Sequence, residues 1–213
     1  MISVLLRTRN EQEHIGFCLQ SINDVLGRDT EVLIANNNST DDTVNIIQMF
    51  DWMDIELFDI DAYTPGETLN YLASKSTNNT LLTLSAHCKL LPNENIGPIV
   101  FTDFEAARAV FGKQIPIYKG KRITPRYIWS HFGDEIVTNM YSEIEDRHFL
   151  HNAFCFYDRE YLLDHPFDDK LSGKEDRYWA KDVVDRGDMY LYEPALQVEH
   201  YYTKNGATWK GLG

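Results

Sequence analysis

The chain has 213 residues, 43% of them hydrophobic and 25% charged, so it can bury the core of one sizeable domain and is not globally disordered. Its formal net charge of -13 argues against binding along a nucleic-acid backbone, because such binding depends on clustered Lys and Arg. Its three cysteines are far apart and lack a Cys-x-x-Cys spacing, which indicates neither a disulfide framework nor a zinc site and favours a reducing compartment.

The sequence contains no apolar run that approaches the ~20 residues of a membrane-spanning helix. Its first residues, ISVLLRTRN, enter a strand directly rather than forming a targeting segment. We therefore expect a cytoplasmic protein, either free or peripheral to a membrane.

Apolar spacing predicts that strands and helices alternate over residues 1–90. Strands are predicted where apolar residues are continuous or alternate, and helices where they recur every three or four positions. In chain order the predicted elements are a strand at 3–6, a helix at 15–26, a strand at 32–34, a helix at 44–50, a strand at 55–60, a helix from Pro65 and a strand at 81–84. This alternation predicts an α/β fold with a mostly parallel sheet, helices on both faces and a ligand site beyond the strand C-termini.

Polar residues before the three predicted helices are typical of N-caps. They are Asn10 with Glu13, Ser39 with Asp42, and Thr64 with Glu67 and a first-turn proline, Pro65. The polar segments RTRNE (7–11) and ANNNSTDDT (35–43) consequently lie at the C-terminal ends of the first two strands.

Beyond residue 92 the pattern is less regular. A helical stretch is predicted near 103–109 and an apolar run at 109–111, whereas residues 118–149 lack periodicity and are expected to be loop-rich or mobile. Arg and aromatic side chains in this region are expected to line an acceptor groove or form a lid: Arg122, Arg126, Tyr127, Trp129, His131 and Phe132. We expect one domain over 1–213, with a nucleotide-binding half (1–90) and an acceptor and catalytic half (91–213).

The segment LSGKEDRYWAKDVVDRG predicts a helix that begins at the acidic pair Glu175 and Asp176 and ends near Gly187. Acids in a first helical turn commonly serve only to complement the helix dipole. Because this pair follows two polar strand ends, it also suggests a carboxylate base that faces a bound sugar nucleotide. Trp179 is expected to pack in the core, and Cys88 and Cys155 are expected to be buried and unreactive.

Four blocks of the sequence resemble the family 2 glycosyltransferases, which have the Rossmann-like GT-A fold and transfer a sugar from a nucleotide-diphosphate donor. The blocks are SVLLRTRNEQEHIGFCLQSI, EVLIANNNSTDDTVNII, GETLNYLASKSTNNTLLTLSAHCKLLP and NAFCFYDREYLLDHPFDDKLSGKEDRYWAKDVVDRG. They occur in the family's order and span most of residues 2–187. The resemblance implies transfer from a UDP- or GDP-sugar to a carbohydrate or other hydroxyl acceptor, with inversion.

The resemblance also implies roles for individual residues. Donor contacts fall on Thr8, Arg9, Asn10, Glu11, Asn36 or Asn37, Lys75, Ser85, Ala86 and His87, while Asn152 falls at the donor or the acceptor. Asn37 and its neighbours are alternatively only turn and cap residues, and Lys75 is alternatively a solvated side chain. An inverting transfer requires a base, for which Asp176 is expected, with Glu175 orienting it, contacting the acceptor or exchanging roles with it.

The family usually ends its fourth strand with Asp-x-Asp, which binds a divalent ion, whereas this chain has Ser85-Ala86-His87. A hard ion such as Mg2+ prefers oxygen ligands, and an imidazole suits Mn2+ or softer metals better. His87 is therefore expected to bind a metal or a phosphate, or to pack beneath the site. His200 is a second candidate for binding a metal or a phosphate, or is a structural strand histidine, and the sequence leaves the use of Mn2+ or Mg2+ open.

Two other functions compete with glycosyl transfer. The missing Asp-x-Asp and the amides at Asn36 and Asn37 are consistent with a noncatalytic nucleotide-sugar-binding protein. A nucleotidyltransferase is disfavoured because the turn after the first strand, RTRNE, has no phosphate-cradling glycines.

Overall fold

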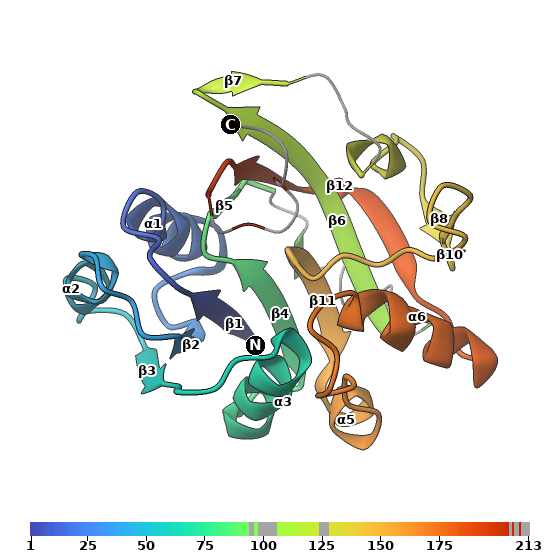
Figure 1. Cartoon of the computed structure of the whole chain (residues 1–213), viewed down its shortest axis with the longest axis horizontal. Coiled ribbons are helices and arrows are strands. Elements are labelled where there is room, and N and C mark those ends of the chain that lie inside the picture. The colour runs from blue at the N-terminus through green and yellow to red at the C-terminus, as the bar shows by residue number, and fades with distance from the viewer. Residues whose placement is uncertain (94–95, 98–105, 124–127, 205, 207–208, 210–213) are drawn as a thin grey trace.

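The computed structural model describes residues 1–93, 96–97, 106–123, 128–204, 206 and 209, and within them a ten-stranded mixed sheet forms the centre of the molecule (Figure 1). Its main path has the order β3-β2-β1-β4-β11-β6-β12-β5. The strands of this path are β1 (Ile2–Thr8), β2 (Glu31–Asn36), β3 (Ile55–Asp59), β4 (Thr80–Ser85), β5 (Cys88–Leu90), β6 (Ala109–Tyr118), β11 (Phe154–Asp158) and β12 (Leu191–Tyr201). The seven strands and helices predicted over the first 90 residues are thereby confirmed, with bounds that differ by a few residues.

Shorter elements complete the fold. β7 (Lys121–Arg122) pairs with β6, β8 (Val137–Thr138) pairs with β12, and β9 (Tyr141–Ser142) pairs with β10 (Arg147–His148) in a separate two-stranded sheet. The described helices are α1 (Ile15–Leu26), α2 (Thr43–Gln48), α3 (Pro65–Lys75), α5 (Arg159–Asp164) and α6 (Glu175–Asp185), with a 3-10 turn, η1, at Trp129–His131. In the part of the chain that is described, no helix has the length and apolar content needed to cross a membrane.

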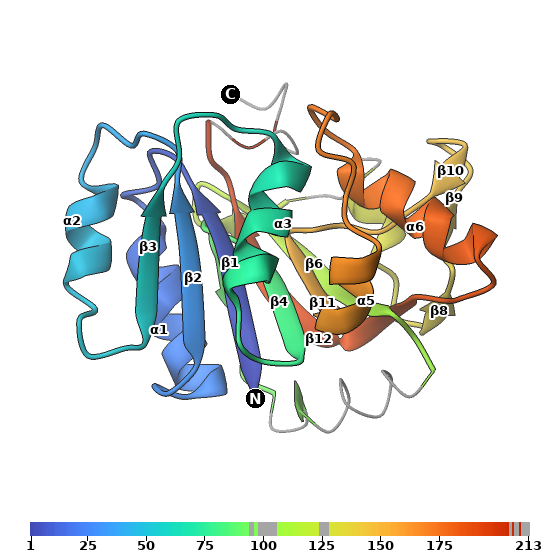
Figure 2. The ribbon, with the colours of Figure 1, turned by 90° about the horizontal axis from the view of Figure 1, so that it is seen from below.

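The strands β3, β2, β1 and β4 are parallel, and β11 is inserted antiparallel between β4 and β6. Alternate residues of β1 face opposite sides of the sheet, as the strand period requires. Val4 and Leu6 pack in a cluster with Ile15 of α1, whereas Leu5 belongs to a cluster with Leu69 of α3 and Trp179 of α6. Helices consequently cover both faces, as predicted (Figure 2).

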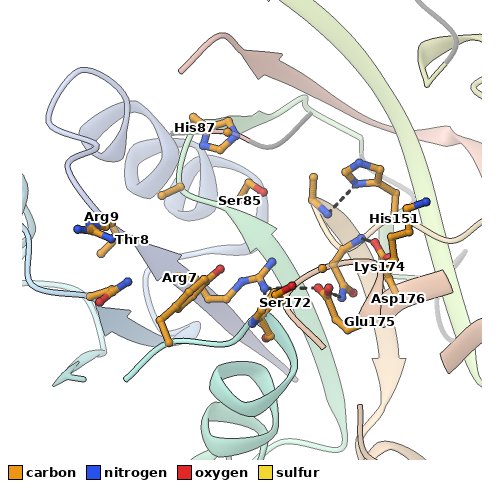
Figure 3. Close-up of a pocket in the computed structure, with 18 of the residues that line it drawn as sticks. Arg7, Thr8, Arg9, Ser85, His87, His151, Ser172, Lys174, Glu175 and Asp176 are labelled. Atoms are coloured by element: carbon orange, nitrogen blue, oxygen red, sulfur yellow. Dashed lines mark hydrogen bonds and ion pairs between the residues drawn. The ribbon is translucent and has the colours of Figure 1, made fainter. Parts of the chain in front are cut away.

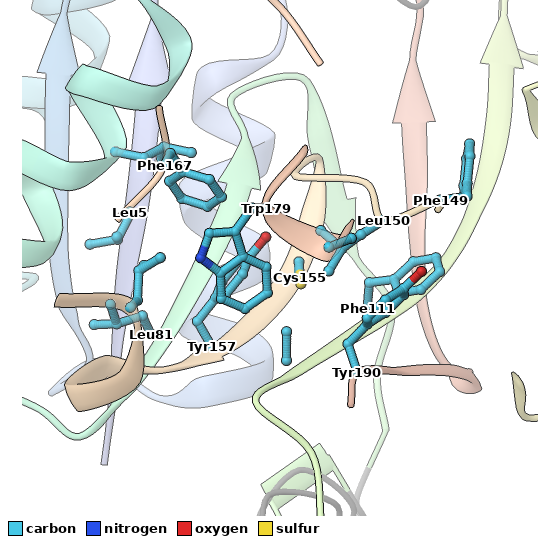
Figure 4. Close-up of a cluster of buried hydrophobic side chains, with 14 of the residues drawn as sticks. Leu5, Leu81, Phe111, Phe149, Leu150, Cys155, Tyr157, Phe167, Trp179 and Tyr190 are labelled. Carbon is cyan, nitrogen blue, oxygen red and sulfur yellow. The ribbon is translucent and has the colours of Figure 1, made fainter. Parts of the chain in front are cut away.

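The cluster beneath α6 is built on aromatic side chains (Figure 4). Trp179 is 4% exposed, its ring contacts Tyr157 edge-on at 5.0 Å, and its indole N–H donates to the backbone oxygen of His165 at 2.7 Å. Trp179 is therefore a core residue, as predicted, and it fixes the helix that carries Asp176. Cys88 and Cys155 are buried free thiols, also as predicted, and burial raises the pKa of both.

One of the three predicted helix caps is correct. Thr64 caps α3, where its side chain accepts from the N–H of Glu67 at 3.3 Å. The Asn10 cap is wrong, because α1 begins after His14 without a side-chain cap. Asn10 has a left-handed φ of 54°, and its side-chain oxygen Oδ1 instead accepts from the N–H of Thr40 at 2.7 Å, so a long-range contact overrides the local signal.

The predicted cap of α2 is also wrong in detail. Asp42 occupies the N-cap position without a side-chain cap bond, and the N–H of Thr43 donates to Asp41 at 3.0 Å instead. Ser39 accepts from the N–H of Asn10 at 3.0 Å, which joins the loops after β1 and β2. These two loops therefore hold each other rather than their own helices.

The second half of the chain is partly as expected. Of the helical stretch predicted near 103–109, residues 103–105 lie outside the described residues. Residues 106–109 are described and are not helical, because Ala109 begins β6 between β11 and β12. After Tyr118, which ends β6, the described residues up to 149 form only short elements, in agreement with the loop-rich prediction. Arg126 and Tyr127 lie outside the described residues, whereas Trp129 and Phe132 are buried in the aromatic cluster and Arg122 is exposed on β7.

Candidate active site

A pocket of about 880 Å³ lies where the C-terminal ends of β1 and β4 face the N-terminus of α6 (Figure 3). This is the position at which open parallel sheets bind ligands, because strand order reverses there and the loops diverge. The pocket wall includes most of the expected site residues: Thr8, Arg9, Asn10, Glu11, Asn37, Ser85, Ala86, His87, Asn152, Glu175 and Asp176. Asn36, Lys75 and His200 do not line it.

The second strand contributes Asn37 rather than Asn36 to the pocket. Asn36 is 4% exposed, donates to Asp59 at 2.7 Å and accepts from the N–H of Ser39 at 3.2 Å. Asn36 lies opposite Asp59 where β2 pairs with β3, so its side-chain amide is already hydrogen-bonded to Asp59 and to the loop that follows β2. Of the two asparagines left open by the sequence, Asn37 is therefore the one that lines the pocket.

Lys75 is separated from the pocket by the length of α3. It is the last residue of that helix, is exposed, and its ammonium lies 5.5 Å from the ring centre of Tyr71. Pro65, at the other end of α3, is the residue of this helix that reaches the pocket. This placement favours the solvated alternative for Lys75.

Glu175 and Asp176 form the first turn of α6 and are both nearly buried, at 5% and 6% exposure. The helix begins after Lys174, which has a left-handed φ of 64°. It ends at Asp185, close to Gly187 as predicted, and this glycine has a φ of 85° and donates to the backbone oxygen of Val184. The acidic pair is thus fixed at the positive end of a well-terminated helix.

Asn152, just before β11, connects the two carboxylates. Its backbone N–H donates to Asp176 Oδ2 at 3.2 Å, and its side-chain amide donates to Glu175 Oε1 at 3.2 Å. The hydroxyl of Tyr157 donates to the Asn152 carbonyl at 2.5 Å, which fixes the orientation of the amide. The sheet therefore positions both acids from below.

Burial raises the pKa of Asp176 to about 6, although Arg177 opposes the shift and Glu175 adds to it. Glu175 has its own cation, since Arg7 Nη1 lies 3.5 Å from its Oε1. Asp176 is therefore a stronger base than an exposed carboxylate and is still mostly ionised near neutral pH. An acid with this combination can accept a proton from a bound hydroxyl.

The structure adds pocket residues that the sequence did not single out. Arg7 and Lys174 bring positive charge, and each adjoins a recognised motif, RTRNE and Glu175-Asp176 respectively, which is a signal that could have identified them. His151 gave no such signal. It is 8% exposed, burial in the first place lowers its pKa well below the ordinary value, and its Nδ1 accepts from the N–H of Ala153 at 3.2 Å.

His87 lines the pocket, and His200 lies behind it with their ring centres 4.8 Å apart. His200 is 1% exposed, and burial first, then the neighbouring His87 and His151, hold its pKa well below the ordinary value. Its Nε2 has no hydrogen-bond partner among the residues described. In the same part of the chain, no three His, Cys, Asp or Glu side chains are grouped to hold a metal ion.

The family model described as "Glycosyl transferase family 2" matches residues 3–165. The chain belongs to glycosyl transferase family 2. The match covers both strand ends, the Ser85-Ala86-His87 segment and Asn152, and it ends before α6. None of the curated proteins compared with this family 2 chain matches it.

Solved structures show the same fold. TarS residues 1–349 from S. aureus, in complex with UDP-GlcNAc, has a TM-score of 0.75 at 16% identity, over 100% of this chain and 61% of that one. The mannosyltransferase PcManGT from Pyrobaculum calidifontis, with GDP-Man and Mn2+, has a TM-score of 0.71 at 17% identity, over 96% and 58%. GalNAc-T7 with UDP, GalNAc and Mn2+ has a TM-score of 0.67 at 14% identity, over 97% and 44%.

These neighbours confirm the GT-A fold expected of this family 2 chain. At 14–17% identity the likeness shows the fold alone. The chain spans 44–61% of the length of these three solved chains.

Proposed function

We propose that the chain transfers a sugar from a nucleoside-diphosphate sugar to a hydroxyl acceptor with inversion, and that Asp176 is the general base. The observation that carries this proposal is the acidic pair at the start of α6, joined by Asn152 and facing the ends of β1 and β4 across the pocket. The donors named with TarS and PcManGT, UDP-GlcNAc and GDP-Man, support this class of donor.

The reaction is a single displacement. Asp176 removes the acceptor hydroxyl proton while that oxygen forms a bond to the anomeric carbon, and the bond from this carbon to the diphosphate oxygen breaks with its electron pair on the diphosphate. Because attack and departure occur on opposite faces, the configuration inverts. Glu175 holds Arg7 and the Asn152 amide and thereby keeps the neighbouring carboxylate in place.

The departing diphosphate requires positive charge. Arg7, Arg9 and Lys174 are cations of the pocket wall, and Arg9 and Lys174 are exposed to it. Asn37 offers an amide for the nucleoside. Charge on the ligand is thus met locally, although the whole chain carries a net charge of -13.

A divalent ion fits this site only with help from the donor. The two imidazoles of His87 and His200 are close enough to share an ion, and the unpartnered Nε2 of His200 is a donor atom of the required kind. The described residues supply no third ligand, so oxygens of the bound diphosphate would complete the shell. Such an ion, Mn2+ rather than Mg2+, would neutralise charge on the leaving diphosphate.

A donor screen with product analysis tests the proposal. UDP- and GDP-sugars are incubated with a panel of glycosides, release of UDP or GDP is followed, and the anomeric configuration of the product is read by NMR. Asp176→Asn is expected to lower kcat by ~10²–10⁴-fold while UDP affinity is unchanged. Undiminished transfer by Asp176→Asn would show that another group is the base, and a retained configuration would contradict the single displacement.

The second candidate is a protein that binds a nucleotide sugar without transferring it. Ser85 stands where the family usually has an acid, and this observation favours the alternative. Calorimetric binding of UDP-sugars, with no nucleotide release from any donor and no difference between wild type and Asp176→Asn, would establish it.

A further inference from the structure

We propose that Glu11 and Gln114 are positioning residues, which hold the imidazoles of His87 and His200 with both Nε2 atoms free to bind one divalent cation. The proposal rests on the proposed function for the identity of the remaining ligands, the diphosphate oxygens. It assigns Glu11 a role behind a histidine instead of the direct donor contact expected from the sequence.

Glu11 fixes the tautomer of His87. The Glu11 carboxylate only accepts hydrogen bonds, so His87 Nδ1, 3.2 Å from Glu11 Oε1, must carry the proton of this contact. In the neutral ring the other nitrogen, Nε2, then has a lone pair available to a metal. A carboxylate behind a ligand histidine both orients the ring and raises its basicity.

Gln114 makes the equivalent contact to His200. Its Oε1 lies 2.8 Å from His200 Nδ1, and an amide oxygen also only accepts. In the neutral ring its Nε2 then also has a lone pair and, among the described residues, no partner. His87, in the turn between β4 and β5, and His200, in β12, are therefore held in the same tautomer by two unrelated acceptors.

Packing prevents either ring from turning away. Trp129 and Trp209 contact the His200 ring edge-on, with ring centres at 5.1 Å and 5.6 Å. Glu11 is itself anchored, because its N–H donates to the Thr43 hydroxyl at 2.7 Å, and it is 6% exposed. Since an imidazole nitrogen binds a metal at ~2.1 Å, rings that share an ion have centres roughly 5 Å apart, close to the 4.8 Å found here.

Paired imidazoles predict a choice among ions. Mg2+ strongly prefers oxygen ligands, whereas Mn2+ accepts nitrogen more readily. The replacement of the family's acid by Ser85 removes an oxygen ligand, so the two oriented histidines become the larger part of what the protein offers. We therefore expect Mn2+ to bind in the presence of UDP, and Mg2+ to compete weakly.

The test measures the ion rather than the reaction. Free Mn2+ is titrated by electron paramagnetic resonance against the wild type, Glu11→Leu and Gln114→Leu, with and without UDP. Both variants remove the acceptor and are expected to weaken Mn2+ affinity by ~10–100-fold, the range usual for partners behind a metal ligand. Matched controls are Glu193→Leu, which removes a buried carboxylate that accepts from the N–H of Ala195, and Gln197→Leu, which removes an amide that donates to the Pro194 backbone oxygen.

The controls are expected to bind Mn2+ as the wild type does. Thermal unfolding without metal shows whether each variant is folded, and a Gln114→Glu variant, which retains the acceptor, is expected to restore affinity. Wild-type Mn2+ affinity in Glu11→Leu and Gln114→Leu would overturn the inference. Sugar transfer that EDTA does not change, with no Mn2+ bound, would also overturn the inference, but it would leave the proposed function intact. Histidine-dependent Mn2+ binding without any sugar transfer would support the inference and would count against the proposed function alone.

Discussion

Nη1 of Arg177 lies 2.8 Å from Oδ2 of Asp176, so the residue that follows the proposed base in sequence also neutralises it. The same guanidinium donates to the backbone oxygen of Leu150, lies 3.4 Å from Glu145 and stands 4.2 Å above the ring of Phe149. Arg177 is thus fixed from several sides. Its charge lowers the pKa of Asp176 against the larger effect of burial.

Replacement of Arg177 is expected to change the pH dependence of transfer. The base must be ionised, so activity in the wild type should rise with pH through about 6, the pKa of Asp176. Arg177→Met removes a charge that favours the ionised form, so the acid limb of the kcat/KM profile should move to higher pH. Arg177→Lys keeps the charge and should bring the limb back toward its wild-type position.

Measurement of the profile on folded protein decides this prediction. Because Arg177 is buried, circular dichroism must show that Arg177→Met is folded. An acid limb at the same pH in the wild type and Arg177→Met, with only kcat reduced, would mean that Arg177 does not tune the base.

Asp176 is also expected to cost stability. Its folded pKa of about 6 is above the value of ~3.9 for an unfolded chain, so the folded state binds this proton more tightly. The protonated side chain therefore adds to the free energy of unfolding below pH ~4, and this contribution declines as the pH rises and is lost above pH ~6. Relative to the wild type, Asp176→Asn should therefore gain on the order of 3 kcal/mol in unfolding free energy between pH 4 and pH 7. Urea denaturation at several pH values measures the difference, and a difference that does not vary with pH would refute the raised pKa.

Two lysines should differ in their effect on nucleotide binding. Lys174 lines the pocket, whereas Lys75 lies at the far end of α3. Lys174→Gln is expected to weaken UDP affinity by ~10-fold, the effect of losing one charged hydrogen bond, and Lys75→Gln is expected to have no effect. Isothermal titration calorimetry compares them. Weaker UDP binding in Lys75→Gln would restore the donor role that the sequence suggested for it.

Gly112 in β6 should not tolerate a side chain. A Cβ there would lie 2.5 Å from Phe154 Cδ1 and 2.6 Å from the backbone oxygen of Leu196, both in flanking strands. Gly112→Ala is expected to destabilise the fold by ~1–3 kcal/mol or more through overpacking. Gly133→Ala, where a Cβ meets nothing within 4 Å, is the control and should be nearly neutral. Similar melting temperatures for the two variants would contradict the packing of β6 described above.

Local patterns were enough to predict the first half of the fold. The spacing of Ile15, Cys18, Leu19 and Ile22 is a property of a single helix, and these residues are buried together as it requires. The acidic pair was equally readable, because Trp179 and Gly187 mark the face and the end of its helix.

Features that depend on distant partners could not be predicted in this way. Asparagine is a residue type that favours helix N-caps, but the side chain of Asn10 accepts a hydrogen bond from the N–H of Thr40, thirty residues away. Asn36 and Asn37 are equivalent in the sequence, and only the pairing of β2 with β3 assigns Asn36 to Asp59. His200 meets His87 because β12 pairs with β5, a register that its own neighbours do not encode.

The antiparallel pairing of β4 with β11 places Ser85 and Asn152 on adjoining strand ends, and the N–H of Ser85 donates to the backbone oxygen of Ala153 at 3.1 Å. The residue that replaces the family's acid is therefore one hydrogen bond away from the segment that supports the base. A negative charge introduced by Ser85→Asp would act on Glu175 and Asp176 as well as on any cation. A change of charge at position 85 is therefore expected to shift the pKa of the base as well as the affinity for a cation.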